Sequence, residues 1–378
     1  MNRRVLNEIF LLRSLACLSI VLLHSMTRIY ENEEGIISLL KLFLSFGTPA
    51  FILISELVLA HAYPLQSPRG FLAKRVKFIL VPFACFTVIY ALQATFTGAG
   101  SGTMAELGTT VLSNLFLGTF PGYFVLIIFQ FYVLHLLFQR QVFPKLRPAV
   151  VLAGTGVIQL AYLTVFNFMP APETAWGALV WDRYIMLFPG WLFYFAFAYY
   201  CGRNYEAFIA RLRRYQALVF SGTAASILLL FVSHEAGWIA HVSSKRVDMI
   251  PFTICLVLTL VLLSSYLKRI PKFFIAVSRY SFGIYLLHTL VYAVLMLGIS
   301  RADFLMNSPI GTGVLLVIGL ALTMLAVRIG IMLPYGEYIF GRIGIGPKQV
   351  TDRKSAESAG IRDGNSPLPP RGTPKTVR

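Results

Sequence analysis

Two side chains that could do chemistry stand eleven positions apart in the first apolar stretch, RSLACLSIVLLHS, which begins at Arg13. Because an α-helix turns by about 100° per residue, eleven steps return to within about 20° of the start. Arg13 and His24 are therefore predicted to lie on one face of a helix, roughly 16 Å apart along its axis. An imidazole, with an unperturbed pKa of about 6.5, suits the removal of a proton from an attacking hydroxyl. The alternatives are structural: Arg13 reaching the lipid headgroups, and His24 bonding a neighbouring carbonyl.

Further ionisable side chains occur inside apolar stretches, where such groups are candidates for a functional site. Glu56, in FILISELVLA, is predicted at the depth of Arg13, so an Arg13–Glu56 ion pair is the economical prediction for a buried carboxylate. His288, in SRYSFGIYLLHTLV, is predicted at the depth of His24, roughly 21 Å along its helix. His135, in YVLHLLF, is expected near the membrane interface.

A basic cluster, Lys74, Arg75 and Lys77, stands at the start of the third apolar stretch. Such clusters are ordinary on the cytoplasmic side of membrane proteins. Three cations at a membrane entrance also suit an anionic ligand that carries phosphate groups. The six histidines are too scattered for a recognisable metal-ligand motif, so no metal site is predicted. Four cysteines in or beside apolar stretches are expected to be core residues: Cys17, Cys85, Cys201 and Cys255.

These residues are embedded in a chain with the composition of a membrane protein. Of its 378 residues, 57% are hydrophobic and 13% are charged, whereas soluble proteins have about 25% charged residues. The mean hydropathy is +0.72. We therefore predict an all-α, polytopic integral membrane protein with ten transmembrane helices, over residues 9–29, 36–62, 76–96, 122–139, 149–168, 184–202, 216–234, 248–267, 274–298 and 309–333.

Basic residues gather in every second connection between these helices, beginning with Arg3 and Arg4, whereas the acidic run at 31–34 lies on the other side. The positive-inside rule then places both termini in the cytoplasm. The net charge of +17 indicates this orientation and contact with anionic lipids, not a nucleic-acid partner. No cleavable signal peptide is expected, because the first apolar stretch is too long and no small-residue cleavage site follows it.

The sequence divides into a membrane domain, residues 1–344, and a basic tail, residues 345–378, which contains SPLPPRGTP. The tail cannot bury a core and is predicted to be disordered in the cytoplasm. The longest outer connection, residues 98–121, contains TVLSNLFLGTF, which is too short to span and is expected to be interfacial or re-entrant.

The functional residues together favour one class of reaction. A base inside the membrane, an arginine beneath it and cations at the cytoplasmic mouth favour acyl transfer from a phosphate-rich, water-soluble donor to a hydroxyl on the far side. Two other functions stay open on the residues alone. Ten helices with buried polar groups also fit a transporter, and an accessory subunit that only organises a synthase would need none of these groups.

Four motifs, in order along the chain, carry a resemblance to a known family: Arg13-x10-His24, GTPAFILISE (47–56), FLAKRVKFILVPF (71–83) and SRYSFGIYLLH (278–288). With them, the sequence resembles the acyltransferase-3 family of membrane O-acyltransferases. The resemblance implies a multi-pass protein of the bacterial cell (inner) membrane, with the lipid bilayer as a partner. It also implies acyl-CoA as the donor substrate and no permanently bound cofactor.

The resemblance implies roles for individual residues. His24 would be the catalytic base, and Arg13 would support the acyl donor, with Glu56 positioning Arg13. Glu56 stands where the family has glycine. Near Pro82, lysines mainly take the place of a pair of arginines that is usual in the family. The cluster Lys74, Arg75 and Lys77 would bind the phosphates of coenzyme A. Three further residues would bind substrate: Ser55, Tyr285 and His288.

Within the family, five stretches resemble a branch associated with poly-β-1,6-N-acetylglucosamine, an exopolysaccharide of biofilms: FGTPAFILIS, RVKFILVP, GYFVLIIFQFYVL, GWLFYFAFAYYCGRNYE and SFGIYLLH. The resemblance implies O-acylation of this extracellular polysaccharide with a succinyl or acetyl group, next to a polysaccharide synthase complex. The same branch has also been regarded as the exporter of the polymer, which is the alternative function.

Overall fold

The computed structural model describes residues 7–31, 34–97 and 100–344, and every regular element in these ranges is a helix. Ten stretches in them are long and apolar enough to cross a membrane, which confirms the prediction of an all-α, polytopic membrane protein. The predicted tail, residues 345–378, lies outside the described residues. The α-helices are α1 (Asn7–Ile29), α2 (Gly35–Leu44), α3 (Gly47–Ala62), α4 (Phe71–Arg75), α5 (Val81–Thr97), α6 (Met104–Leu112), α7 (Phe124–Gln141), α8 (Pro148–Phe168), α9 (Ala175–Arg183), α10 (Leu192–Arg203), α11 (Tyr205–Arg214), α12 (Gln216–Glu235), α13 (Met249–Tyr266), α14 (Lys272–Ile299), α15 (Pro309–Met332) and α16 (Gly336–Ile339).

Most predicted spans agree with these helices to within a few residues, and the second and third spans depart for local reasons. The second is broken into α2 and α3 at Ser45, whose hydroxyl donates to the Lys41 carbonyl at 2.8 Å. The third begins earlier than predicted and passes through a π-helix, η1 (Val76–Leu80), just before Pro82. Because Pro82 has no N–H to bond the Phe78 carbonyl, the α-helical pattern is interrupted there, and the chain widens into π geometry.

The sixth span also differs from its prediction, because α10 begins eight residues later, at Leu192. Two 3-10 turns precede it, η4 (Tyr184–Met186) and η5 (Phe188–Trp191). Pro189 lies in the second turn, and a proline is tolerated only in the first turn of a helix. The helix therefore becomes α-helical only after this proline.

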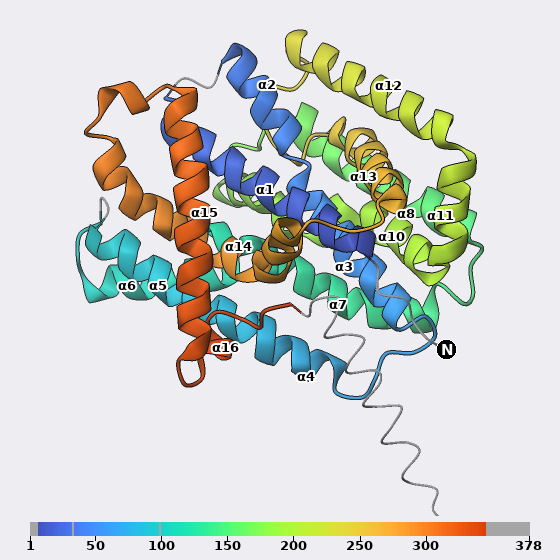
Figure 1. Cartoon of the computed structure of the whole chain (residues 1–378), viewed down its shortest axis with the longest axis horizontal. Helices are drawn as coiled ribbons and strands as arrows, with labels where there is room; N and C mark the ends of the chain where they lie inside the picture. The colour runs from blue at the N-terminus through green and yellow to red at the C-terminus, as the bar shows by residue number, and fades with distance from the viewer. Residues whose placement is uncertain (1–6, 32–33, 98–99, 345–378) are drawn as a thin grey trace, which may run out of the picture.

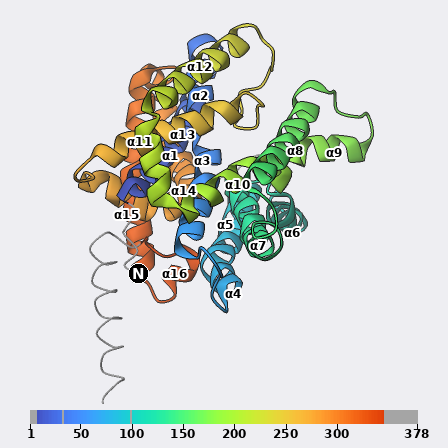
Figure 2. The same ribbon diagram turned by 90° about the vertical axis from the view of Figure 1, so that its right-hand side faces the viewer.

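Helix α1 is central in the bundle and positions the two residues of the Arg13-x10-His24 motif. It packs against α3, α13, α14 and α15 (Figure 1). In Figure 2, α15 lies on one side of α1 and α3, and α5, α7 and α8 lie on the other. A helix enclosed in this way can turn its polar side chains toward protein rather than lipid.

Small residues let the central helices approach closely, as is usual where helices associate inside a membrane. A Cβ atom added at Gly47 of α3 would lie 2.6 Å from the Ser19 hydroxyl and 2.7 Å from the Ala16 carbonyl of α1. A Cβ atom added at Gly202 of α10 would lie 2.2 Å from the Leu57 carbonyl of α3. The packing of α1, α3 and α10 is therefore set by direct contact of side chain and backbone.

The segment between α5 and α7 folds back on the bundle instead of spanning it alone. It forms α6, the π-helix η2 (Ser113–Leu117) and the 3-10 turn η3 (Pro121–Tyr123). The buried Asn114 amide donates to the Thr87 carbonyl of α5 at 3.3 Å. The segment is thereby tied to α5, and it leads the chain into α7.

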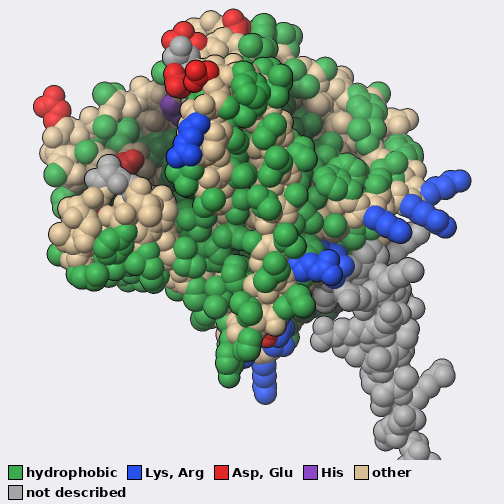
Figure 3. Space-filling view, turned by 60° about the vertical axis from the view of Figure 1, so that its left-hand side comes forward, with side chains coloured by type: hydrophobic (Ala, Val, Ile, Leu, Met, Phe, Trp, Pro, Cys, Tyr) green, Lys and Arg blue, Asp and Glu red, His purple; other side chains and the backbone are tan. Residues whose placement is uncertain are grey.

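The surface is divided as expected for a protein in a bilayer. Figure 3 shows hydrophobic side chains over the broad middle of the molecule, with most Lys and Arg side chains toward the lower and right edges and most Asp and Glu side chains toward the top. The lower end carries the 69–77 segment, so we refer to it as the predicted cytoplasmic end, and to the opposite end as the predicted outer end.

The close approach of α10 and α3 gives a test of this packing. Gly202→Ala introduces a methyl group against the Leu57 backbone, which cannot move aside as a flexible side chain can. We expect a loss of about 1–3 kcal/mol of stability from overpacking, measured as a lower midpoint of thermal unfolding in detergent. The matched control is Gly154→Ala in α8, where an added Cβ meets nothing within 4 Å. Equal midpoints for the two variants would contradict the packing described here.

Candidate functional site

A cavity at the predicted cytoplasmic end collects several of the predicted site residues. Its volume is about 490 Å³, and we name it the inner cavity. The polar and basic residues in its lining are Arg13, Thr48, Ser55, Tyr63, Lys74, Arg75, Tyr132, Ser281, Tyr285 and Arg342. Arg13 from α1 and the basic residues from α4 thus share one cavity, although they are far apart in the sequence.

The predicted basic cluster is divided by the structure. The Arg75 guanidinium lies 5.0 Å from the ring centroids of both Phe71 and Tyr132, which hold it at the cavity by cation–π contact. Lys74 is exposed and lines the cavity. Lys77 does not line it, because its ammonium lies over the Tyr338 ring, at 4.9 Å from the centroid. Lys74 and Arg75, but not Lys77, can therefore reach a ligand in this cavity.

Arg342 is a cation in the inner cavity that the sequence analysis missed. Its guanidinium forms hydrogen bonds of 2.8 and 3.1 Å with the Glu337 carboxylate and lies 3.6 Å from the Phe78 ring centroid. The hydrogen bond from Arg342 lowers the pKa of Glu337, so the carboxylate stays ionised. The available signal was weak, since Arg342 is a single basic residue after the last span.

A second cavity lies at the predicted outer end and contains His24. Its volume is about 370 Å³, and we name it the outer cavity. Its ionisable lining residues are His24, Lys41, Tyr123, Lys245 and Tyr285. Among the described residues, none forms a hydrogen bond with the His24 ring. His24 therefore has free ring nitrogens beside a cavity, as a general base requires.

His288 lies behind His24 rather than in the lining of either cavity. Their ring centroids are 5.2 Å apart. The His288 Nδ1 is 2.8 Å from the Ile284 carbonyl, and a carbonyl only accepts, so Nδ1 carries the proton. Its Nε2 is buried without a partner. His288 thus contacts the imidazole of His24 and does not itself line either cavity.

The two cavities meet at four shared side chains, which we call the wall. Ile20, Thr48, Phe124 and Tyr285 line both of them. The Tyr285 hydroxyl donates to the Pro121 carbonyl at 2.6 Å and accepts from the Phe124 N–H at 3.0 Å. These bonds fix Tyr285 of α14 to the start of α7. Arg13 and His24, which share a face of α1, are therefore on opposite sides of this wall.

The predicted Arg13–Glu56 ion pair does not form. Glu56 is 2% exposed, and its carboxylate is 2.7 Å from Nδ1 of His135 of α7. His135 is fully buried, at 0% exposed, so its ring packs inside the protein. The reason is that α3 and α7 pack against each other and bring the two groups together. Glu56 does not line the inner cavity, and among the described residues Arg13 has no ion-pair partner.

In the described ranges, no three His, Cys, Asp or Glu side chains come together as a possible metal site. All four cysteines are free thiols in buried or partly buried positions, in agreement with their prediction as core residues. The arrangement instead offers a cation-lined cavity at one end, an imidazole at the other and a wall between them.

The sequence of the chain is similar to those of one known protein family. A family model described as an acyltransferase domain matches residues 6–328, which is nearly the whole membrane domain. The chain belongs to the acyltransferase-3 family. It is therefore a multi-pass bacterial membrane protein with an acyltransferase domain, as the four sequence motifs predicted.

Individual relatives carry two kinds of name. The chain is 40% identical over 291 residues to "Putative membrane-bound acyltransferase YfiQ" of Bacillus subtilis, covering 75% of this chain and 80% of that protein. It is 27% identical over 301 residues to "Probable poly-beta-1,6-N-acetyl-D-glucosamine export protein" of Staphylococcus aureus, covering 76% and 83%. A protein of the same name from Staphylococcus epidermidis is 28% identical, covering 75% and 80%. No solved structure matches the chain.

The buried Glu56–His135 pair gives a test of the packing of α3 against α7, which supports the site. His135→Ala leaves the Glu56 carboxylate without its hydrogen-bond donor, so we expect a loss of about 3–5 kcal/mol of stability. Denaturation of the purified protein in detergent measures this loss. In a double-mutant cycle, Glu56→Ala with His135→Ala should cost less than the sum of the single changes. Additive costs would show that the two side chains do not interact.

Proposed function

We propose that this protein is a membrane O-acyltransferase that moves a succinyl or acetyl group from cytoplasmic acyl-CoA to hydroxyls of an extracellular polysaccharide, poly-β-1,6-N-acetylglucosamine. The observation that carries the proposal is the pair of cavities on opposite sides of one wall, with cations in the inner cavity and His24 in the outer cavity. Such a pair suits a donor and an acceptor that come from different sides of the membrane.

Acyl-CoA is the proposed ligand of the inner cavity. Lys74, Arg75 and Arg342 line its mouth, and cations of this kind bind phosphate groups through charge-assisted hydrogen bonds. Arg13 lies in the same cavity without an ion-pair partner among the described residues. We assign it to the donor, where its charge would hold the thioester end or stabilise the developing oxyanion. Ser55 would contact the same end of the donor.

His24 is the proposed general base. The hydroxyl oxygen of the acceptor bonds to the thioester carbonyl carbon while its proton passes to a free nitrogen of His24. The carbon–sulfur bond then breaks, and the sulfur of coenzyme A leaves with that proton from His24. The products are an ester on the sugar and the free thiol, so atoms and charge balance. His288 acts here as a positioning residue, through its contact with the His24 ring.

The wall between the cavities has a role in this reaction. Donor and base lie on opposite sides of Tyr285 and Phe124, so the acyl group must pass between these side chains to reach His24. Bound acyl-CoA would displace or thread this wall, a local movement of the kind that commonly gates enzyme sites. Glu56 supports the inner side indirectly, by fixing α3 to α7 through His135.

Export of the polymer is the second candidate function, and one observation favours it. Two relatives carry the name of export proteins, and they are 27% and 28% identical to this chain over about three quarters of its length. An exporter would use the cavities as a passage for the polymer, and His24 would then line that passage.

Replacement of His24 separates these functions. We expect His24→Ala to reach the membrane normally and to lower acyl transfer by about 10²–10⁴-fold, the usual contribution of a general base. Mass spectrometry of the secreted polysaccharide measures acylation. Unmodified polymer outside the cell supports transfer, whereas polymer retained inside supports export. The control is His234→Ala, which removes a histidine that lines neither cavity.

The donor assignment has its own test in the divided basic cluster. Lys74→Met should raise the KM for acyl-CoA about fivefold, as expected for a loss of roughly 1 kcal/mol from one partly exposed charge contact. Lys77→Met, only three residues away but held over the Tyr338 ring, is the matched control and should leave the KM near its original value. Steady-state kinetics on the protein in nanodiscs measure both. A larger effect of Lys77→Met would overturn the assignment.

A further inference from the structure

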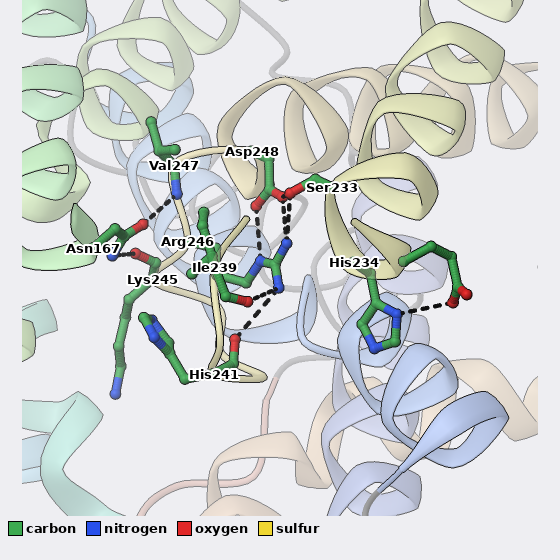
Figure 4. Close-up of polar contacts among 10 residues, drawn as sticks. Asn167, Ser233, His234, Ile239, His241, Lys245, Arg246, Val247 and Asp248 are labelled. Atoms are coloured by element: carbon green, nitrogen blue, oxygen red, sulfur yellow. Dashed lines mark hydrogen bonds and ion pairs between the residues drawn. The ribbon is translucent and has the colours of Figure 1, made fainter. Parts of the chain in front are cut away.

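The loop between α12 and α13, residues 236–248, contains a buried ion pair whose polar atoms are extensively satisfied. Arg246 is 1% exposed and Asp248 is 7% exposed. The Arg246 guanidinium donates to the Asp248 carboxylate at 2.6 and 3.1 Å and to the Ser233 hydroxyl at 2.8 Å. It also donates to the Ile239 carbonyl at 3.0 Å (Figure 4). A buried pair with this many bonds fixes the loop, since breaking any part leaves an unpaired charge.

A second clamp holds the same loop from α8. The Asn167 amide donates to the Lys245 carbonyl at 3.2 Å, and its oxygen accepts from the Val247 N–H at 2.8 Å. Lys245 is thus bracketed by two independent sets of bonds, from Asn167 and from Arg246. Figure 4 shows its side chain pointing away from the Arg246–Asp248 pair.

The Lys245 side chain enters the outer cavity, where it shares the lining with His24. Its ammonium lies 5.4 Å from the Tyr123 ring centroid. In the part of the chain that the structure describes, Lys245 has neither an ion pair nor a side-chain hydrogen bond. A loop this firmly fixed therefore presents an ammonium without an ion pair to the cavity that contains the proposed base.

The described lining of the outer cavity includes Lys245 but no Asp or Glu. The nearby Asp248 is already bonded to Arg246. The charge of Asp182 also acts on Lys245, but Asp182 is 65% exposed and is paired with Arg183 at 2.9 Å. Burial lowers the pKa of Lys245 to about 8, so the amine is mostly protonated at pH 7. A partly buried ammonium without an ion pair of its own favours an anionic ligand group.

We propose that Lys245 forms a carboxylate-binding subsite in the outer cavity, which selects a substrate that carries an acid group beside the reacting atoms. The inference rests on the proposed function, and it specifies the substrate class. Two sources could supply the carboxylate. One is the far end of a dicarboxylic acyl chain, which would precede the thioester through the wall toward Lys245. The other is an acidic sugar of the acceptor.

The experiment compares substrates that differ only in this charge. The protein in nanodiscs is assayed with succinyl-CoA and acetyl-CoA, on a neutral N-acetylglucosamine oligomer and on an oligomer that alternates N-acetylglucosamine with glucuronate. We expect Lys245→Met to lower the ratio of kcat/KM for the charged over the neutral substrate by about tenfold, the effect of one charge-assisted hydrogen bond. A changed donor ratio identifies the acyl chain as the source, and a changed acceptor ratio identifies the sugar. Both ratios unchanged would overturn the proposal.

Two controls keep the result specific. Lys245→Arg retains the charge and should retain the ratio, which separates charge from folding. Arg301→Met removes an exposed cation of the predicted outer end that lines neither cavity, and it should leave both ratios unchanged. Equal losses in Lys245→Arg and Lys245→Met would show that the position is structural and overturn the subsite.

A binding measurement separates this proposal from the proposed function. Succinate and its neutral dimethyl ester are titrated into the purified protein, and thermal stabilisation is recorded. We expect stabilisation by succinate, but not by the ester, in the wild type and in Arg301→Met, and its loss in Lys245→Met. If the wild type transfers no acyl group yet binds succinate through Lys245, the transferase function fails and the subsite stands. Equal binding by wild type and Lys245→Met overturns the subsite alone.

Discussion

The cost of placing a charge in hydrocarbon is the constraint on which this structure depends. Each ionisable group inside a bilayer must find a partner or face a water-filled space. Glu56 and His135 take the first course, as do Arg246 and Asp248 in the loop at the predicted outer end. Arg13 and His24 take the second, each in its own cavity. The paired groups hold the scaffold, and the groups that face cavities are left available for substrates.

This division explains why α1 occupies the centre of the bundle. A peripheral helix would turn part of its surface to lipid, and Arg13 would then extend to the headgroups. Enclosure by α3, α13, α14 and α15 removes that option. The close approach needed for enclosure comes from small residues such as Gly47, which bring backbones nearly into contact. The close packing around α1 therefore also keeps its two functional side chains, Arg13 and His24, inside the bundle.

Much of this organisation could be predicted from the sequence. Hydropathy identified ten spans because a stretch that crosses hydrocarbon must be long and apolar, and helix periodicity placed Arg13 and His24 on one face. Partners across helices could not be predicted in this way. Depth alone paired Arg13 with Glu56, but the lateral packing of α3 and α7 gives Glu56 to His135. Arg342 and Lys245 were missed because their positions depend on how terminal and loop segments fold back on the bundle.

The wall formed by Ile20, Thr48, Phe124 and Tyr285 has a consequence for the cell as well as for catalysis. Two hydrated recesses that met inside the bundle would form a pore, and protons would leak down their gradient. Side chains that fill this gap, with Tyr285 tied to the Pro121 and Phe124 backbone, would keep the membrane electrically tight. Only a few atoms at a time would then need to cross, and the energised bilayer would stay intact while they do.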